Sequence, residues 1–422
     1  MMTRRVVVTG IGAVTAIGHG RQGLWEGVQR GASSVRSLTR FDPSPYRARM
    51  AAEVDLNVAD YLDRKQLKRL DRFAQFAIIA ARMAVEDAGL RLPDEPPGTV
   101  GVLMGSALGG ITMAETQHLA YLQGGLRAVN PALALAVFGA SCSCTIAIDL
   151  GITGPNSTNA NSCSAGTMAL GEAFRMIRAG HAEVVLAGGA EAPITPLSFG
   201  AFDVIHAMST ANDTPSLAYR PFDRERDGFV MAEGATVLVL EECQHAVQRG
   251  ATIFGEILGY GLTNDAHHMT APHPQGEPAA RAMRLALQEA QVMPEAIGYI
   301  NAHGSSTPLN DKTETLAIKQ VFGDHAYAIP ISSTKAMHGH AFGATGAIEV
   351  ALCCLAFHHH YLPPTINYST PDPECDLNYL PNHGVHATVD HILKNSFGFG
   401  GINATLVLQR YRPDPEAAPR TP

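Results

Sequence analysis

Short apolar runs typical of strands alternate along the whole chain with longer segments that carry apolar residues at helical spacing. Segments 73–89 and 279–290 show the helical pattern, and the first of them ends on a glycine. The predicted strands are residues 6–9, 100–104, 184–187, 235–240, 298–301, 329–333 and 404–408. Such alternation predicts an α/β protein whose sheets are covered by helices.

Composition narrows the class of protein further. Apolar residues make up 46% of the chain and charged residues 17%, which predicts a large buried core rather than general disorder. The length of 422 residues allows two ordinary domains or one large two-lobed unit. A net charge of −8 argues against broad nucleic-acid binding. The seven cysteines show neither zinc-ligand spacing nor a disulfide framework, so we expect a reducing, cytoplasmic location.

The N-terminus imitates a signal peptide, because two arginines precede an apolar segment. That segment is short and is interrupted by Thr9, Gly10 and Gly12, so we interpret it as a buried strand followed by a turn. No run reaches the roughly 18 apolar residues that cross a bilayer, and no membrane span is expected.

Cys163 lies where a helix is predicted to begin, in the sequence Asn-Ala-Asn-Ser-Cys-Ser-Ala-Gly-Thr-Met. The helix runs from Ser164 to Arg178 and stops at Gly180. A thiol at that end meets unpaired N–H groups and the positive end of the helix dipole, which favour thiolate. Gly166 leaves room for the close approach of another backbone or a substrate. The pattern indicates either a nucleophile or a buried structural cysteine.

Three clusters of polar residues and glycines lie downstream, at 301–308, 333–343 and 395–403, where loops at strand ends are expected. His303 follows a predicted strand, where it could also simply cap a turn. His340 lies at the predicted start of a helix, whose dipole favours a neutral imidazole able to donate Nε2–H to an oxyanion. A cysteine with separated histidines is the arrangement expected for thiol catalysis.

Taken in order, Cys163, His303, Lys335, His340 and the Gly-Phe-Gly-Gly at 398–401 resemble the β-ketoacyl-acyl carrier protein (ACP) synthases. The closest resemblance is to the synthase II family of the Cys-His-His class, within the condensing-enzyme or thiolase superfamily, and it covers residues 5–408. It implies a thiolase-like five-layer α-β-α-β-α fold built from two similar βαβαβαββ halves. We expect the first half at residues 1–255, carrying the cysteine, and the second at residues 256–411, carrying the two histidines and the lysine. Residues 412–422 are expected to form a disordered tail.

The resemblance assigns catalytic roles. Cys163 is the nucleophile, and His303 and His340 hold the thioester carbonyl of the second substrate. The backbone N–H of Phe397 joins that of Cys163 in an oxyanion hole, and the same Phe397 acts as a gate over the thiol. His338 is expected to be structural or to lie at the rim.

Lys335 is expected inside the site, where a buried ammonium group needs an acidic partner. The resemblance places Glu314 in that role. Asp311 competes with it, because it lies one helical turn earlier and could share the same helix face.

The implied reaction is a decarboxylative Claisen condensation in fatty-acid or related polyketide or polyene synthesis. An acyl group passes to Cys163 and is then extended by malonyl-ACP, giving β-ketoacyl-ACP and CO₂. No cofactor or metal is expected for turnover, because decarboxylation drives the step and both substrates are carried on the phosphopantetheine arm of ACP.

The resemblance also implies binding residues. Substrate contacts are expected at Leu108, Phe202, Thr270, Thr307 and Phe399. A basic patch that docks acidic ACP is expected at Lys65, Lys68, Arg69, Arg72 and Arg127. The competing interpretation of the pocket residues is that they simply pack in the core. The competing interpretation of the cations is that they form a solvated helix face.

The chain departs from the family pattern at several places. Asn161-Ser162 precedes the cysteine where Thr-Ala is common, and His-Gly-Ser-Ser replaces His-Gly-Thr-Ser. Segment 136–144 replaces an Asn-containing helix near the subunit interface. His206 stands where an arginine is common, which puts one ACP or pantetheine contact in doubt. These changes suggest a specialised relative with intact condensing chemistry.

Two rival interpretations fit the sequence less well. Gly10 and Gly12 after a strand suggest dinucleotide binding, but the Gly-x-Gly-x-x-Gly spacing fails because position 15 is threonine. A non-catalytic chain-length subunit of a polyketide heterodimer is disfavoured, since the cysteine and both histidines are retained. The remaining alternatives are a homodimer and the catalytic half of such a heterodimer.

Overall fold

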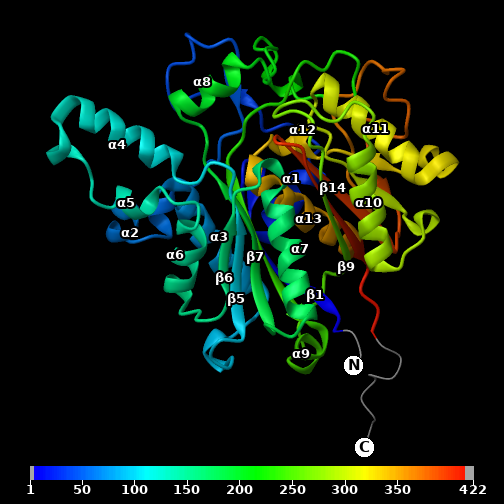
Figure 1. Cartoon of the computed structure of the whole chain (residues 1–422), viewed down its shortest axis with the longest axis horizontal. Helices are drawn as coiled ribbons and strands as arrows, with labels where there is room; N and C mark the ends of the chain where they lie inside the picture. The colour runs from blue at the N-terminus through cyan, green and yellow to red at the C-terminus, as the bar shows by residue number, and fades with distance from the viewer. Residues whose placement is uncertain (1–3, 414–422) are drawn as a thin grey trace, which may run out of the picture.

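The ten main strands form two sets of five, and the spatial order of the strands in one set is the mirror image of the order in the other (Figure 1). The structure, a computed structural model, describes residues 4–413. The first set, in spatial order, is β6 (Asn156–Asn159), β5 (Val100–Gly105), β7 (Val184–Glu191), β8 (Gly234–Glu242) and β1 (Val6–Thr15). The second continues as β9 (Gly255–Asn264), β15 (Ile402–Gln409), β14 (His391–Gly398), β10 (Tyr299–Asn301) and β11 (Ile331–Ser332). A three-residue antiparallel pairing of β1 with β9 joins the two sets.

Helices enclose and separate the two sets, which gives the five α-β-α-β-α layers that were expected (Figure 1). One outer layer holds α3 (Arg72–Asp87) and α6 (Ser141–Leu150), and the other holds α10 (Glu277–Ala290) and α11 (Pro308–Phe322). Between the sheets lie α7 (Ala165–Arg178) and α13 (Phe342–His359). Three large apolar cores fill the spaces between these layers, so helices and sheets stabilise one another throughout.

Shorter elements lie around these layers. The remaining α-helices are α1 (Gly20–Gln29), α2 (Arg64–Arg69), α4 (Ile111–Gly124), α5 (Leu133–Ala136), α8 (Pro196–Val204), α9 (Cys243–Gln248) and α12 (Lys335–His338). The short strands are β2 (Gly18–His19), β3 (Arg36–Ser37), β4 (Met50–Ala51), β12 (Tyr361–Leu362) and β13 (Val385–His386).

The central helix α13 is apolar on all sides, which suits a helix packed between two sheets. By length and composition alone this helix is long and apolar enough to cross a membrane, although Glu349 interrupts its apolar residues. However, 89% of that stretch is buried within the protein, so the chain's own sheets and helices cover its apolar side chains.

Glycines explain why helices pack so closely on β1 and β9. A Cβ at Gly12 would lie 1.9 Å from the Ala80 carbonyl oxygen of α3, and one at Gly261 equally close to the Ala282 carbonyl oxygen of α10. Gly10 is restricted in the same way by α3. The glycines that suggested a dinucleotide site therefore serve helix–strand packing.

The predicted strands are present, but β1 continues to Thr15, past a register shift after Val8, where a turn was expected. Strands β9 and β14 were not predicted, because three glycines interrupt the first and buried polar residues the second. The division at 255/256 stays a prediction. Most of the predicted tail lies outside the described residues, although Arg412, inside them, pairs with Asp390 at 2.7 Å.

Candidate active site

Cys163 lies in a single 3₁₀ turn, Ser162–Ser164, that leads directly into α7. Ser162 has a φ of 53°, a left-handed conformation that costs energy for a residue with a side chain. At Gly166 a Cβ would lie 2.6 Å from the Gly343 carbonyl oxygen, so the close approach predicted there is made by the first turn of α13. The strained turn and the tight helix contact together hold the thiol at the junction of the two central helices.

Cys163 is only 6% exposed. Burial raises its pKa to about 12, although a hydrogen bond from the backbone of Phe399 and the charge of Lys335 act in the opposite direction. The position at the helix start favours thiolate, as the sequence suggested, but the desolvation of the buried thiol outweighs that effect. The resting group at neutral pH is therefore the thiol.

The backbone donor beside the thiol is Phe399, not the predicted Phe397. Phe397 belongs to β14, where it pairs with Asn403. The strand ends at Gly398, and from there the chain passes next to Cys163. The ring of Phe397 instead lies 5.9 Å from that of His303. The predicted donor is therefore wrong by two residues, because residues up to Gly398 belong to the strand β14, which was not predicted.

His303 and His340 face each other with ring centroids 5.6 Å apart and an interplanar angle of 77°. Burial, followed by the charge of Lys335, lowers the pKa of both imidazoles well below the ordinary histidine value. Nδ1 of His340 lies 3.0 Å from the Thr345 hydroxyl, and a hydroxyl that donates there leaves the ring proton on Nε2. Two neutral imidazoles can thus serve as hydrogen-bond donors inside one pocket.

Lys335 does not pair with the predicted Glu314. Its Nζ lies 2.6 Å from Oε1 of Glu349 and also donates to the carbonyl oxygen of His303. Glu314 accepts hydrogen bonds from the N–H groups of His303 and Gly304, both at 2.8 Å, and so holds the histidine loop by its backbone. This division of roles arises because α13, unlike α11, presents its carboxylate directly to the lysine.

Two other residues near the lysine have structural contacts. Asp311 accepts hydrogen bonds from the N–H groups of Phe222 and Ser306 and does not pair with the lysine. His338 is buried, with its ring nitrogens 3.0 Å from the Thr334 hydroxyl and 2.8 Å from the Gly339 carbonyl oxygen. Both contacts agree with a structural role for His338.

Sequence reasoning missed Glu349 and a second lysine, Lys394, that pairs with it at 2.7 Å. Signals for both were present. Glu349 is a single carboxylate in the middle of an otherwise apolar helix, and Lys394 is a cation after two apolar residues in a buried strand. Such residues are seldom buried without a partner.

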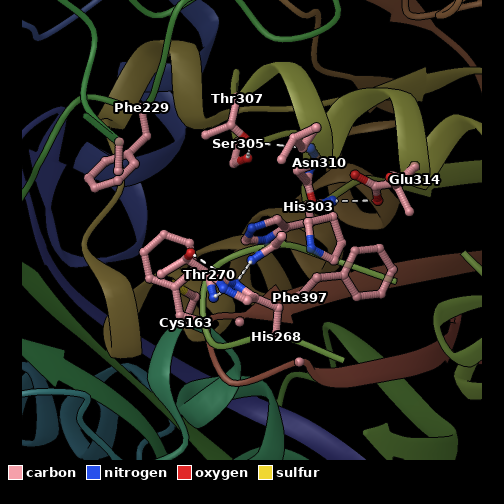
Figure 2. A pocket seen from close by; sticks show the side chains of 18 of the residues that line it. Cys163, Phe229, His268, Thr270, His303, Ser305, Thr307, Asn310, Glu314 and Phe397 are labelled. Atoms are coloured by element: carbon pink, nitrogen blue, oxygen red, sulfur yellow. Dashed lines mark hydrogen bonds between the residues drawn. The ribbon is translucent and has the colours of Figure 1, made fainter. Parts of the chain in front are cut away.

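A cavity of about 280 Å³ opens over these groups, and Figure 2 shows several labelled side chains arranged around it. Of the predicted residues it is lined by Cys163, His303, His340, Glu314, Phe397, Thr270, Thr307 and Phe399. His206, which stands where an arginine is common, also lines it. One pocket therefore combines the proposed nucleophile with several of the predicted substrate contacts.

Two predicted pocket residues do not line this cavity. Phe202 lies behind the wall, with its ring 4.7 Å from that of Phe342 and 6.4 Å from that of Phe399. Leu108 is half-buried, and its backbone N–H donates to Glu191. An aromatic cluster thus closes the side of the cavity on which Phe202 lies.

The predicted basic patch is only partly available. Lys65, Lys68 and Arg69 are exposed on α2, and Arg127 is exposed in the turn Leu126–Ala128. Arg72 is not free for a partner: its Nε lies 2.9 Å from Oε2 of Glu233, and its guanidinium packs on an aromatic ring. Within residues 4–413, no group of three or more His, Cys, Asp or Glu side chains is placed to hold a metal ion.

Comparisons with known proteins agree with this geometry. Residues 3–246 match the family model "Beta-ketoacyl synthase, N-terminal domain", and residues 254–369 match "Beta-ketoacyl synthase, C-terminal domain". A 3-oxoacyl-[acyl-carrier-protein] synthase 2 from Synechocystis is 46% identical over 97% of this chain and 99% of that protein. The protein of the same name from Coxiella burnetii is 44% identical over the same shares.

Solved structures of ketosynthases share this fold. One similar structure is described as a type II polyketide synthase acyl carrier protein in complex with its ketosynthase bound to the hexaketide. A chain of that complex superposes on this protein with a TM-score of 0.91 and is 38% identical to it in sequence. The ishigamide ketosynthase/chain length factor also has a TM-score of 0.91, with 37% identity. Both matches cover 97% of this chain and 100% of the other.

Proposed function

This chain belongs to the β-ketoacyl synthase family, and we propose that it is an acyltransferase that condenses an acyl-enzyme thioester with malonyl-ACP. The products are β-ketoacyl-ACP, two carbons longer, and CO₂. One observation supports this most directly: a buried cysteine, two neutral imidazoles and a backbone N–H donor meet in a single cavity.

In the first half-reaction, Cys163 sulfur attacks the thioester carbonyl of acyl-ACP. A carbon–sulfur bond to the enzyme forms, the bond to the pantetheine sulfur breaks, and the thiol proton ends on the departing carrier thiol. The N–H groups of Cys163 and Phe399 stabilise the tetrahedral oxyanion. Since the resting thiol has a raised pKa, we expect deprotonation to accompany attack.

In the second half-reaction, His303 and His340 donate N–H groups to the thioester oxygen of malonyl-ACP. The carbon–carbon bond to the carboxylate breaks, CO₂ leaves, and the electron pair forms an enolate held by both donors. Its carbon then attacks the acyl carbonyl on Cys163, and the cysteine thiolate departs. Lys335 supports this step by binding the His303 carbonyl oxygen and adding positive charge.

No cofactor enters these steps, and we propose that none is bound for turnover. We further propose that ACP docks near the exposed cations of α2 and Arg127. The division into halves at residues 255/256 and a cytoplasmic location belong to the same proposal.

We also propose that a second subunit covers the exposed apolar face that α4, α5 and α6 form. Its large exposed side chains are Leu119, Leu122, Leu126, Leu135, Phe138 and Ile148. In Figure 1, α4 projects away from the body of the molecule. An apolar face of this kind marks a protein interface. The partner is a second copy of this chain or, as the name of the ishigamide structure indicates for that protein, a chain length factor.

The test is to incubate the pure protein with acyl-ACPs of several lengths plus malonyl-ACP. Intact mass follows acylation of Cys163, and chromatography follows β-ketoacyl-ACP. Elongation that disappears in Cys163→Ala supports the proposal and reveals the chain preference. Acylation without elongation, restored by a chain-length subunit, favours the heterodimer. Absence of acylation from every carrier contradicts the proposal.

A further inference from the structure

Lys394 is a buried lysine for which the reaction as described above has no use. It lies in β14, five residues before Phe399, and its side chain is fully buried. Its Nζ donates to the carbonyl oxygen of Asn395 and to the Ser396 hydroxyl. It also lies 2.7 Å from Oε2 of Glu349, the carboxylate that binds Lys335 through its other oxygen.

Two ammonium groups therefore share one carboxylate, and all three side chains have 0% exposure. The next acidic group is Glu314, whose oxygens accept hydrogen bonds from backbone N–H groups and from Nδ2 of Asn395 at 3.2 Å. A buried excess of positive charge is costly unless an anion balances it. Both half-reactions form anions close by: a sulfur anion at Cys163 and an enolate between the histidines.

The same contacts connect Lys394 to the frame of the site. The Ser396 hydroxyl that accepts from Lys394 lies 2.7 Å from the Thr167 hydroxyl, one turn beyond Cys163 on α7. The Ser396 carbonyl oxygen accepts a hydrogen bond from the Ser164 hydroxyl at 3.0 Å. Lys394 thus contacts the strand that delivers the Phe399 donor and, through it, the helix that presents the thiol.

The pKa shifts of neighbouring groups also show the effect of the two lysines. Both lysines lower the pKa of His303 and of His340, after the larger effect of burial. Burial lowers the pKa of Lys394 itself, and Glu349 opposes that change. The other titratable groups that interact with the cluster of Lys335, Glu349 and Lys394 are Cys353, Glu314, Cys163, Tyr219, Tyr299, His303, His338 and His340.

We propose that Lys394 is a positioning residue that acts through Glu349 and Lys335. By occupying the second oxygen of Glu349, it prevents that carboxylate from neutralising Lys335 and leaves a net positive charge behind the pocket. That charge favours the Cys163 anion and the enolate and keeps the imidazoles unprotonated. The inference rests on the proposed condensing function.

The test compares four proteins that differ in the net charge of the cluster, all carrying Cys144→Ala to remove an exposed cysteine. They are the parent, Lys394→Met, Glu349→Gln and the double variant. The rate of Cys163 alkylation by iodoacetamide is followed by peptide mass over a range of pH values below the thiol's midpoint. Circular dichroism and thermal unfolding verify the fold, and Lys394→Gln replaces Lys394→Met if the latter does not fold.

Removing the Lys394 charge is expected to slow alkylation about tenfold at each pH, since loss of a neighbouring cation raises a thiol pKa by about one unit. Glu349→Gln is expected to accelerate it. The double variant restores the parental net charge and is expected to return close to the parental rate, which a merely structural role would not produce. Lys312→Met, which removes an exposed lysine that pairs with Glu374 at the surface, is the matched control and is expected to leave the rate unchanged.

A second readout is the pH profile of condensation by enzyme acylated in advance. Lys394→Met is expected to move its acid limb upward by about one unit, because the histidines accept protons more readily once a cation is removed. Unchanged alkylation rates, or a double variant as slow as Lys394→Met, overturn the inference. A parent that iodoacetamide alkylates normally but that no acyl-ACP acylates overturns the proposed function instead, so the two failures are distinguishable.

Discussion

The two sets of strands carry similar scaffolds but place different chemistry on them. In each, a central helix packs between the sheets and an outer helix packs on glycines of the strand next to the other set. The first set contributes the proposed nucleophile, the Cys163 thiol in the turn that leads into α7. The second contributes the imidazoles, both lysines and two buried carboxylates.

This difference shows how one backbone plan can separate two tasks. In the proposed reaction the Cys163 thiol changes its charge, and it lies at a strained turn next to a backbone donor. The second set must keep its charge pattern constant, and the ion pairs of Glu349 with both lysines provide that. The two contributions meet where the start of α7 packs closely on the start of α13, at Gly166 and Gly343.

The largest expected effect comes from removing the contribution of the first set. Cys163→Ala should reduce elongation by at least about 10⁴-fold, because no other group can form the acyl-enzyme. Intact mass should show no acylation, while the unfolding midpoint stays near that of the parent. Residual acylation at another cysteine would assign the nucleophile elsewhere.

Removing a donor of the second set should separate the half-reactions. His303→Ala or His340→Ala is expected to slow CO₂ release by about 10²–10³-fold, the cost of losing one oxyanion donor. Acylation of Cys163 should persist, because its oxyanion is held by backbone groups. Rapid-quench measurement of acyl-enzyme alongside CO₂ checks this, and equal loss of both steps would contradict the division of tasks.

The shared scaffold can be tested with matched substitutions. Gly12→Ala and Gly261→Ala each place a methyl group 1.9 Å from a helix carbonyl oxygen, so the outer helix must shift. Each should lower the free energy of unfolding by about 1–3 kcal/mol or more, as overpacking does. Urea unfolding measures both. A large cost at one glycine and none at the other would show that the two packings are not equivalent.

The smallest expected effect concerns the rate of condensation, which should not change as the pH falls through 6.5. Because the pKa values of His303 and His340 are lowered, both stay neutral as the pH falls through 6.5. Condensation by enzyme acylated in advance should therefore remain constant across that range, whereas alkylation of the free Cys163 thiol should keep rising with pH toward its pKa of about 12. A loss of condensation centred near 6.5 would mean that an imidazole titrates at its ordinary value.

The sequence by itself was sufficient to predict the plan of the fold and to single out Cys163, His303 and His340, which the structure brings into one pocket. Apolar periodicity revealed the α/β alternation, and α3, α7 and α10 lie where it placed them. Local context brought out Cys163 at a helix start and His340 before α13. Residues close in sequence determine such features, so they can be recognised without a structure.

Tertiary structure alone decided the partners and the charges. Lys335 pairs with Glu349 rather than Glu314, Lys394 shares that carboxylate, and Phe399 rather than Phe397 faces the thiol. The raised pKa of Cys163 likewise comes from burial, which no local pattern reports. Contacts between distant segments depend on exact helix rotation and strand length, and desolvation depends on everything packed around a group. The sequence therefore names the chemical groups, and the packing of the two central helices between the sheets decides what each of them can do.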